Sequence, residues 1–210
     1  MIAQQYVRTF FNDTTNHSAV WLQHLNAYQS MPNKAKDAQK FIILDHWYHA
    51  LDIGRGYVTK AELVEIMRWK LTRGKMRPLL GKIEALAEEA VQLATYNGIN
   101  CLRRGVDENS IRAALEAISG PLNGVGPATA SAVLAKWNTA VPFMSDAGLI
   151  AVNGSTDYKM QDYLAYYHGV VAKVAQLNAD GVSGRVWTAK EVEAVLHLVY
   201  SRFDLGVVIP

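Results

Sequence analysis

Hydrophobic residues recur along this chain with the spacing of α-helices. In residues 17–30, for example, Val20, Leu22, Leu25 and Tyr28 fall roughly on one helical face. No segment alternates between hydrophobic and polar residues over the length of a strand, which is the pattern of a half-buried β-strand. The sequence therefore predicts an all-α protein, a helical bundle of about eight to ten helices.

Residues typical of helix ends bound several of these segments. Thr59 with Glu62, and Thr188 with Glu191, have the spacing of capping boxes, and Asp107 can cap residues 108–119. Trp187 and Val192 are placed as a hydrophobic staple beside the second box.

Other helix boundaries are predicted from single residues. We expect a helix over 34–54 that follows Asn33 and stops at Gly54, and another that begins at Thr156 or Asp157. Residues 78–98 begin with proline and end with glycine, which predicts one continuous helix.

The chain is expected to form a single unit, 1–210, with two lobes. Glycine-rich segments at 51–59 and 151–158 are the candidate boundaries. We predict that residues 60–152 form one lobe, and that 1–59 and 153–210 together form the second.

Composition limits the classes of protein that the chain can represent. With 210 residues, 50% of them hydrophobic, it can bury a sizeable core. Its one cysteine, Cys101, excludes an internal disulfide, a Cys-based zinc site and a Cys-ligated iron–sulfur cluster, and is expected to be a small packing residue. No apolar run has the length of a membrane span, and the N-terminus lacks a signal-peptide pattern. We expect an intracellular protein.

Positive charge is concentrated in one stretch although the formal net charge is only +2. Residues 68–82 contain no acidic residue and carry six basic ones: Arg68, Lys70, Arg73, Lys75, Arg77 and Lys82. Without these six, 15 basic residues would face 19 acidic ones, a net charge of −4. Such a patch suits phosphate contacts with DNA, although a solvated loop would have the same composition. Trp69 could stack on or wedge beside a base, or could belong to the core.

A glycine-rich turn lies between two predicted helices. Residues 121–127 follow the helix 108–119 and precede a helix that opens with Pro127. Gly124 and Gly126 permit backbone conformations in which the N–H groups around them point outward at a helix N-terminus, which suits an anion. An ordinary helix–turn–helix connection is the alternative.

The segment LNGVGPATASAVLAKWNTAVPFMSDAGLIAV, from Leu122 to Val152, resembles the helix-hairpin-helix DNA glycosylase superfamily, specifically its endonuclease III-like members. The resemblance covers residues 60–152 and is strongest over 107–152. In that family a hairpin of the type L-P-G-[VI]-G precedes a helix and grips a DNA phosphate. The resemblance assigns this role to Asn123, Gly124, Val125, Gly126, Ala128 and Thr129. It also implies a monovalent cation, K⁺ or Na⁺, on the backbone carbonyls of Leu122 and Val125.

Asp146 is the candidate catalytic residue. It lies 18 positions beyond Ala128, where the family has an aspartate at a helix start. A carboxylate beside the sugar can stabilise the oxocarbenium-like transition state of glycosidic-bond cleavage, or activate the attacking water. The alternative is a simple helix cap.

Ala128 stands where bifunctional members of the family have a nucleophilic lysine. Alanine cannot form a Schiff base, so the resemblance implies base excision by water without β-lyase activity, or no chemistry. A lysine from elsewhere, such as Lys70, could substitute. The family's cluster cysteines are also absent, so no cofactor is expected.

Two further features carry weaker signals. His46 and His49 lie near two aspartates, but no third ligand has a recognisable spacing, so no side-chain metal site is predicted. A cluster of aromatic residues on one predicted helix could line a base pocket but suits core packing better. Its members are Tyr163, Tyr166, Tyr167 and His168.

The preferred interpretation is a monomeric, monofunctional DNA glycosylase of base excision repair, acting on damaged or mismatched double-stranded DNA. It would be nuclear in a eukaryote, and cytoplasmic or nucleoid-associated in a bacterium. The alternatives are a DNA-binding protein that keeps the fold without excision, and a helical interaction domain that binds no nucleic acid.

Overall fold

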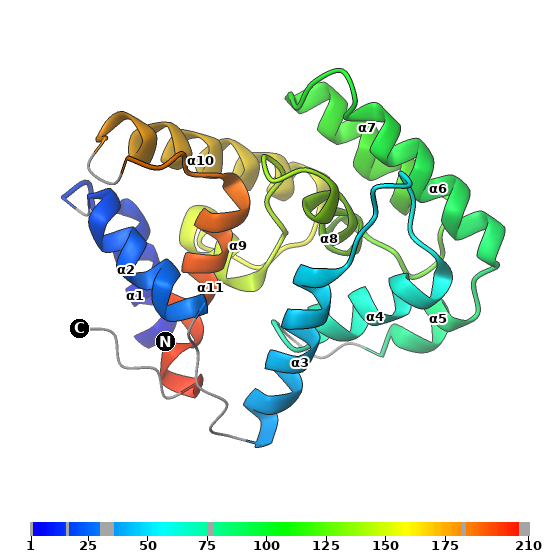
Figure 1. Ribbon diagram of the computed structural model, residues 1–210, viewed down its shortest axis with the longest axis horizontal. Coiled ribbons are helices and arrows are strands. Elements are labelled where there is room, and N and C mark those ends of the chain that lie inside the picture. The colour runs from blue at the N-terminus through cyan, green and yellow to red at the C-terminus, as the bar shows by residue number, and fades with distance from the viewer. Residues whose placement is uncertain (1, 16, 30–35, 75–77, 182–183, 206–210) are drawn as a thin grey trace.

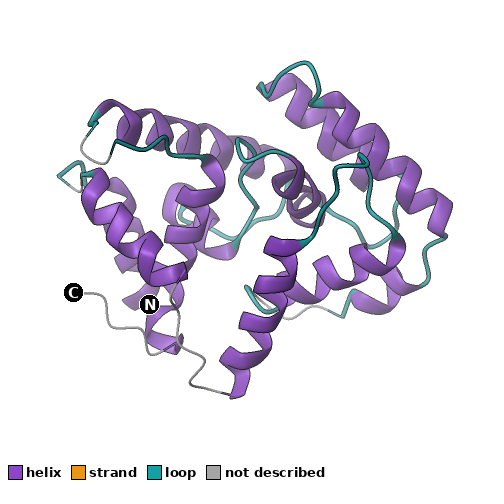
Figure 2. Ribbon diagram, in the orientation of Figure 1, coloured by secondary structure: helices purple, strands orange, loops and turns teal. Residues whose placement is uncertain are grey.

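The computed structural model describes residues 2–15, 17–29, 36–74, 78–181 and 184–205. Within these residues the regular structure is entirely helical (Figure 2), which confirms the all-α prediction. The described residues form eleven helices, slightly more than predicted. They are α1 (Ile2–Asn12), α2 (Ser18–Gln29), α3 (Lys36–Ala50), α4 (Lys60–Leu71), α5 (Leu80–Glu84), α6 (Glu88–Cys101), α7 (Glu108–Ser119), α8 (Pro127–Trp137), α9 (Asp146–Asn153), α10 (Met160–Ala179) and α11 (Ala189–Leu205).

The helices pack as two groups (Figure 1). We call α1, α2, α9, α10 and α11 the terminal lobe, and α3 to α8 the middle lobe. The grouping differs from the predicted division at 60 and 152. The α3 helix joins the middle lobe because Tyr48 stacks on Trp69 of α4, with 3.6 Å between ring centroids. The α9 helix joins the terminal lobe because α1, α10 and α11 cover it.

The predicted helix caps form. The hydroxyl of Thr59 accepts a hydrogen bond from the N–H of Glu62 (3.2 Å), and the Glu62 carboxylate accepts one from the N–H of Thr59 (2.8 Å). Thr188 and Glu191 make the same reciprocal pair, and Asp107 caps α7. These contacts need only neighbouring residues, which is why the sequence predicts them.

Residues 78–98 do not form the single predicted helix. The helix breaks at 85–87, and α6 continues past Gly98 to Cys101. A Cβ at position 98 would lie 2.5 Å from Cγ1 of Ile118. This glycine therefore allows α6 and α7 to pack closely, and does not end a helix.

Three further boundaries differ from prediction. The α10 helix begins at Met160 after Lys159, later than Thr156 or Asp157, and α3 ends at Ala50, before Gly54. In α2, Leu25 and Tyr28 are buried as predicted, whereas Val20 and Leu22 are only partly covered and Trp21 takes their place in the core. Asn33 and the terminal segment 206–210 lie outside the described residues.

Within the described residues, no helix combines the length and the apolar character needed to cross a membrane.

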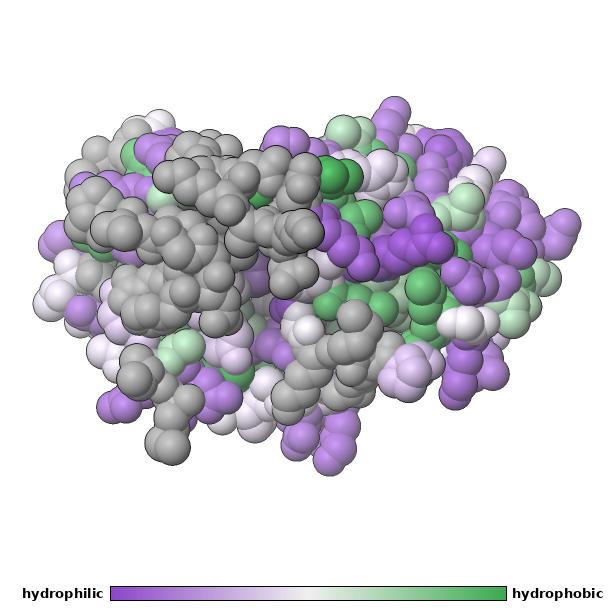
Figure 3. Space-filling view, turned by 90° about the horizontal axis from the view of Figure 1, so that it is seen from below, coloured by the Kyte–Doolittle hydropathy of each residue, from purple (hydrophilic) through white to green (hydrophobic). Residues whose placement is uncertain are grey.

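Seen from below (Figure 3), hydrophobic side chains reach the surface between hydrophilic ones on the side of the middle lobe.

A buried ion pair joins the two lobes. Arg73, just beyond α4, makes two hydrogen bonds of 3.1 Å to the carboxylate of Glu193 on α11. The exposed fractions of these side chains are 2% and 4%. The rings of Trp69 and Phe143 pack against the guanidinium, at 4.9 and 5.4 Å from ring centroid to Cζ.

His197 makes the stability of the fold depend on pH. It is buried on α11 against Phe41, and burial holds its pKa well below the ordinary value, with a further contribution from the Arg73 charge. The unfolded chain therefore binds a proton below about pH 6.5 that the folded chain excludes, so stability falls as the pH falls. We expect His197→Leu to reduce the slope of unfolding free energy against pH by up to about 1.4 kcal/mol per pH unit. Urea denaturation between pH 4.5 and 7 measures it, and His17→Leu, at an exposed position, is the control.

Candidate functional site

A cavity of about 170 Å³ opens where the two lobes meet. The end of α4, the start of α8, the start of α9 and the segment after α9 contribute its walls. The lining residues are Lys70, Leu71, Arg73, Gly74, Leu79, Gly126, Pro127, Ala128, Thr129, Phe143, Met144, Ser145, Asp146 and Tyr158. We call it the Asp146 cavity. It brings together Asp146 and the start of α8, two features that the sequence singled out separately.

Asp146 is the first residue of α9, and its carboxylate faces this cavity. The helix is capped by Ser145, whose hydroxyl accepts a hydrogen bond from the N–H of Gly148 (3.1 Å). The Asp146 carboxylate instead accepts a hydrogen bond from the hydroxyl of Tyr158. A Cβ at Gly74 would lie 3.0 Å from the carboxylate, so a larger residue there would crowd it. The side-chain cap is thus supplied by the preceding residue, while Asp146 keeps the first-turn position in which an acid favours the helix dipole.

The loop that leads to Asp146 is fixed by hydrogen bonds from both lobes. The hydroxyls of Tyr163 and Tyr166 on α10 donate to the carbonyls of Pro142 and Phe143, at 3.0 Å each. The N–H of Met144 donates to the hydroxyl of Ser131 on α8 (2.9 Å). These contacts hold the aspartate at a fixed place in the cavity wall.

The aromatic cluster on α10 therefore serves packing. Tyr163 and Tyr166 are fully buried, and Tyr167 donates a hydrogen bond to the carbonyl of Val106 (3.2 Å). His168 is exposed and pairs with Glu108 of α7 at 2.9 Å.

The turn between α7 and α8 has the conformation expected of its glycines. Gly124 has φ +87°, a value that other residues adopt only with strain, and Gly126 begins α8 in an extended conformation. The N–H of Val125 donates to the carbonyl of Leu122 (3.0 Å). Asn123 is exposed on this turn.

The start of α8 presents backbone donors at the edge of the Asp146 cavity. The N–H groups of Thr129 and Ala130 both donate to the carbonyl of Gly126, at 3.0 Å each. Among the described residues, no acceptor is bonded to the N–H groups of Gly126 or Ala128. Donors of this kind at a helix N-terminus favour an anion.

Ala128 and Lys70 line the same cavity as Asp146. Ala128 is 6% exposed and brings no reactive group. Lys70 comes from α4, and its place in the cavity gives a structural basis for the sequence alternative in which an amine from elsewhere faces the site.

The predicted basic stretch does not form one surface. Arg73 is buried against Glu193, so its prediction as a DNA contact is wrong in this structure. Its charge is already neutralised by Glu193, although the residue contributes to the wall of the Asp146 cavity. Arg68 is exposed and pairs with Glu65 and Glu84. Lys75 and Arg77 lie outside the described residues. Lys82 is exposed beside the turn, and a Cβ at Gly124 would lie 2.8 Å from its Cβ.

Trp69 is a core residue, and its prediction as a base wedge is also wrong. Its ring is 1% exposed and stacks on Tyr48. Its indole N–H donates to Asp45 at 2.8 Å. Because the ring is stacked in the core and the indole N–H is hydrogen-bonded there, this side chain cannot insert into a DNA duplex.

His46 and His49 do not take part in a metal cluster that can be recognised in the described residues. Cys101 is a partly buried free thiol.

Comparison of the chain with family models, curated proteins and solved structures found no match. Function therefore has to be inferred from the residues of the cavity.

Tyr158, Gly74 and Glu193 were missed by sequence reasoning. Tyr158 and Gly74 lie between helices, where no periodicity marks a residue. Glu193 is in α11, distant in sequence from the arginine that it binds. One signal in the sequence could have identified Glu193: it is a carboxylate on an otherwise hydrophobic helical face. The neighbouring residues on that face are fully buried, namely Val192, Val195, Leu196 and Val199.

Proposed function

We propose that this protein is a monofunctional DNA glycosylase that hydrolyses the N-glycosidic bond of a damaged or mismatched base in double-stranded DNA. The observation that supports it best is the shared cavity at the lobe junction, where the Asp146 carboxylate lies beside the N-terminus of α8. A carboxylate and an anion-binding helix start are the two elements needed to act on a sugar held by its phosphate.

In the proposed reaction the bond between sugar C1′ and the base nitrogen breaks as positive charge develops on the sugar. The Asp146 carboxylate stabilises this charge and accepts a proton from the water whose oxygen bonds to C1′. The departing base takes up a proton from solvent water and Asp146 returns its proton to solvent, so the net reaction adds one water across the broken bond. Tyr158 keeps the carboxylate oriented through its hydroxyl. The N–H groups of Gly126 and Ala128 hold the neighbouring phosphate.

An excision assay over a panel of lesion-containing and mismatched duplexes tests this proposal directly. We expect release of a free base from at least one duplex. If the whole panel gives no release while duplex binding weakens steeply with salt, the DNA-binding protein without excision is the better assignment.

The turn is tested by two glycine substitutions. Gly126→Ala fits the fold, because the backbone is extended and no atom lies within 4 Å of the added Cβ, but its methyl group shields the N-terminus of α8. We expect it to weaken duplex binding about tenfold with an unchanged unfolding temperature. Gly124→Ala is expected to destabilise the protein by about 1–2 kcal/mol through its positive φ. A duplex affinity that responds neither to Gly126→Ala nor to added salt would contradict both DNA interpretations. The protein would then be assigned as a helical interaction domain that does not bind nucleic acid.

Borohydride trapping tests the absence of β-lyase activity. Because Ala128 has no amine, we expect no covalent adduct with damaged DNA. An adduct that disappears in Lys70→Gln would contradict this expectation and assign the nucleophile to Lys70, which lines the same cavity.

A further inference from the structure

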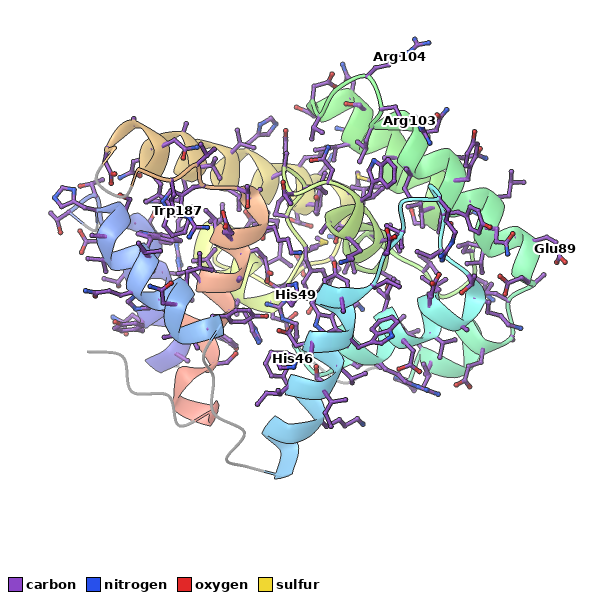
Figure 4. The ribbon with its side chains drawn as sticks, in the orientation of Figure 1. His46, His49, Glu89, Arg103, Arg104 and Trp187 are labelled. Carbon is purple, nitrogen blue, oxygen red and sulfur yellow. The ribbon has the colours of Figure 1, made fainter. Side chains whose placement is uncertain are left out.

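A second cavity, of about 460 Å³, lies between the lobes on the other side of the buried ion pair. It is bounded by α2 and α11 of the terminal lobe and by α3 of the middle lobe. Figure 4 shows His46 and His49 on the side of α3 that faces the terminal lobe. We call it the Lys190 cavity. Its volume is in the range of small-molecule sites. Arg73 and Phe143, which line the Asp146 cavity, stand between the two spaces.

The carboxylates of this cavity are already satisfied by the protein. Asp45 accepts hydrogen bonds from the hydroxyl of Tyr28 (2.7 Å) and the indole of Trp69 (2.8 Å). Burial by itself raises the pKa of Asp45, but the contacts with His49, Arg73 and Trp69 outweigh it and hold the pKa well below its usual range. This residue is therefore a fixed anion without spare capacity for a cation.

Glu191 is engaged in the same way. Its carboxylate accepts hydrogen bonds from the N–H of Thr188 (3.0 Å) and from the Thr188 hydroxyl (2.9 Å), and it pairs with Arg185. Neither acidic residue of the cavity is left to receive a ligand's positive charge.

The basic groups are not satisfied in this way. Lys190 is half-buried in the first turn of α11, where its backbone N–H donates to the carbonyl of Thr139 (3.0 Å). Within the described part of the chain, no hydrogen bond or salt bridge is made by its ammonium group or by the ring of His46. The Nε2 atom of His49 lies 3.5 Å from the Asp45 carboxylate and pairs with it. Lys190 and His46, from the two lobes, are thus the groups without a partner among the described residues that face this space, and His49 lies beside them.

The ammonium group of Lys190 is partly desolvated. Burial lowers its pKa below the ordinary value, although the charges of Asp45, Glu193 and Glu191 act in the opposite direction, and the Arg73 charge adds a smaller lowering. Lys136, whose ammonium donates to the carbonyl of His49 at 2.7 Å, adds another positive charge close by. An anion bound by Lys190 would offset the desolvation of its ammonium group by a direct charge-assisted contact.

We infer that the Lys190 cavity binds a small organic phosphate, with the phosphate group between Lys190 and the rings of His46 and His49. A phosphate presents several acceptor oxygens in different directions, which suits donors that converge from two helices. The organic part packs against Leu25, Tyr28 and Ala194. This site is independent of the base-excision chemistry proposed for Asp146.

Inorganic phosphate is the probe, and the ring signals of the histidines in ¹H–¹³C spectra are the readout. His46→Gln and His49→Gln assign the two signals. We expect both signals to move saturably with phosphate, and Lys190→Met to weaken the titration about tenfold or more. Lys40→Met removes one exposed charge from α3 outside the cavity and is expected to leave the titration unchanged.

Two results would overturn the site: histidine signals that show no saturable change, or a Lys190→Met titration equal to that of the unaltered protein. His46→Gln changes only an exposed side chain, so weaker binding in this variant supports the site even if Lys190→Met fails to fold. Displacement of phosphate from these histidines by a short duplex would overturn the assignment to a free ligand. Asp146→Asn is expected to bind phosphate normally, which separates this test from that of the proposed function.

Discussion

Asp146→Asn is expected to lower base release about 100- to 1,000-fold while leaving duplex affinity within about twofold. The amide has nearly the same shape as the carboxylate but no negative charge, so it cannot stabilise the charge that develops on the sugar. Its contact with Tyr158 can persist, because the amide oxygen also accepts a hydrogen bond. Single-turnover excision on the best duplex of the panel, together with equilibrium binding at the same salt concentration, measures both effects.

Asp157→Asn is the matched control, because this carboxylate is exposed, lies in the same segment as Tyr158 and does not line the cavity. We expect it to retain full activity. Tyr158→Phe removes the hydroxyl that donates to Asp146 and should have a smaller effect than the loss of the carboxylate. Base release by Asp146→Asn at the rate of the unaltered protein would exclude this carboxylate from the chemistry.

Glu193→Gln is expected to destabilise the protein by about 3–5 kcal/mol. The guanidinium of Arg73 is buried, and without its partner it would remain charged in the core. Burial raises the pKa of Glu193 and the Arg73 charge opposes this rise. Each charge of the pair therefore offsets the cost of burying the other. Urea denaturation at pH 7 measures the loss.

Replacement of both partners by apolar residues provides the decisive comparison. The double variant Arg73→Met, Glu193→Leu should recover most of the stability lost by either single change, since it leaves no buried charge without a partner. Glu65→Gln, which breaks an exposed pair with Arg68, should cost no more than about 1 kcal/mol. Equal, small effects for Glu193→Gln and Glu65→Gln would show that the lobes do not depend on the buried pair.

The parts of the fold that could be predicted depend on neighbouring residues. The caps at Thr59, Asp107 and Thr188 need only the next turn of chain, and the structure contains all three. The break at 85–87 and the grouping of α3 with the middle lobe depend on contacts with distant helices, which periodicity does not encode.

The candidate site, like the fold, could be predicted only in part. The spacing between Ala128 and Asp146 anticipated two residues that the fold brings to one cavity. Two predictions within the basic stretch were wrong because charge does not reveal burial: Arg73 turns inward, and Trp69 is a core residue. Tyr158 is held against Asp146 by a loop whose course no local pattern specifies.

The order of the helices along the chain has a consequence for synthesis on the ribosome. The α1 helix is made before its partners α9 and α11, which come from residues 146–205. The middle lobe, by contrast, is continuous in sequence from α3 to α8, so it can assemble while the C-terminal helices are still being made. The α1 helix would then pack only after the middle lobe, once α9 and α11 have also been made. Until that moment its apolar side chains, including Val7 and Phe10, would depend on chaperones for protection from aggregation.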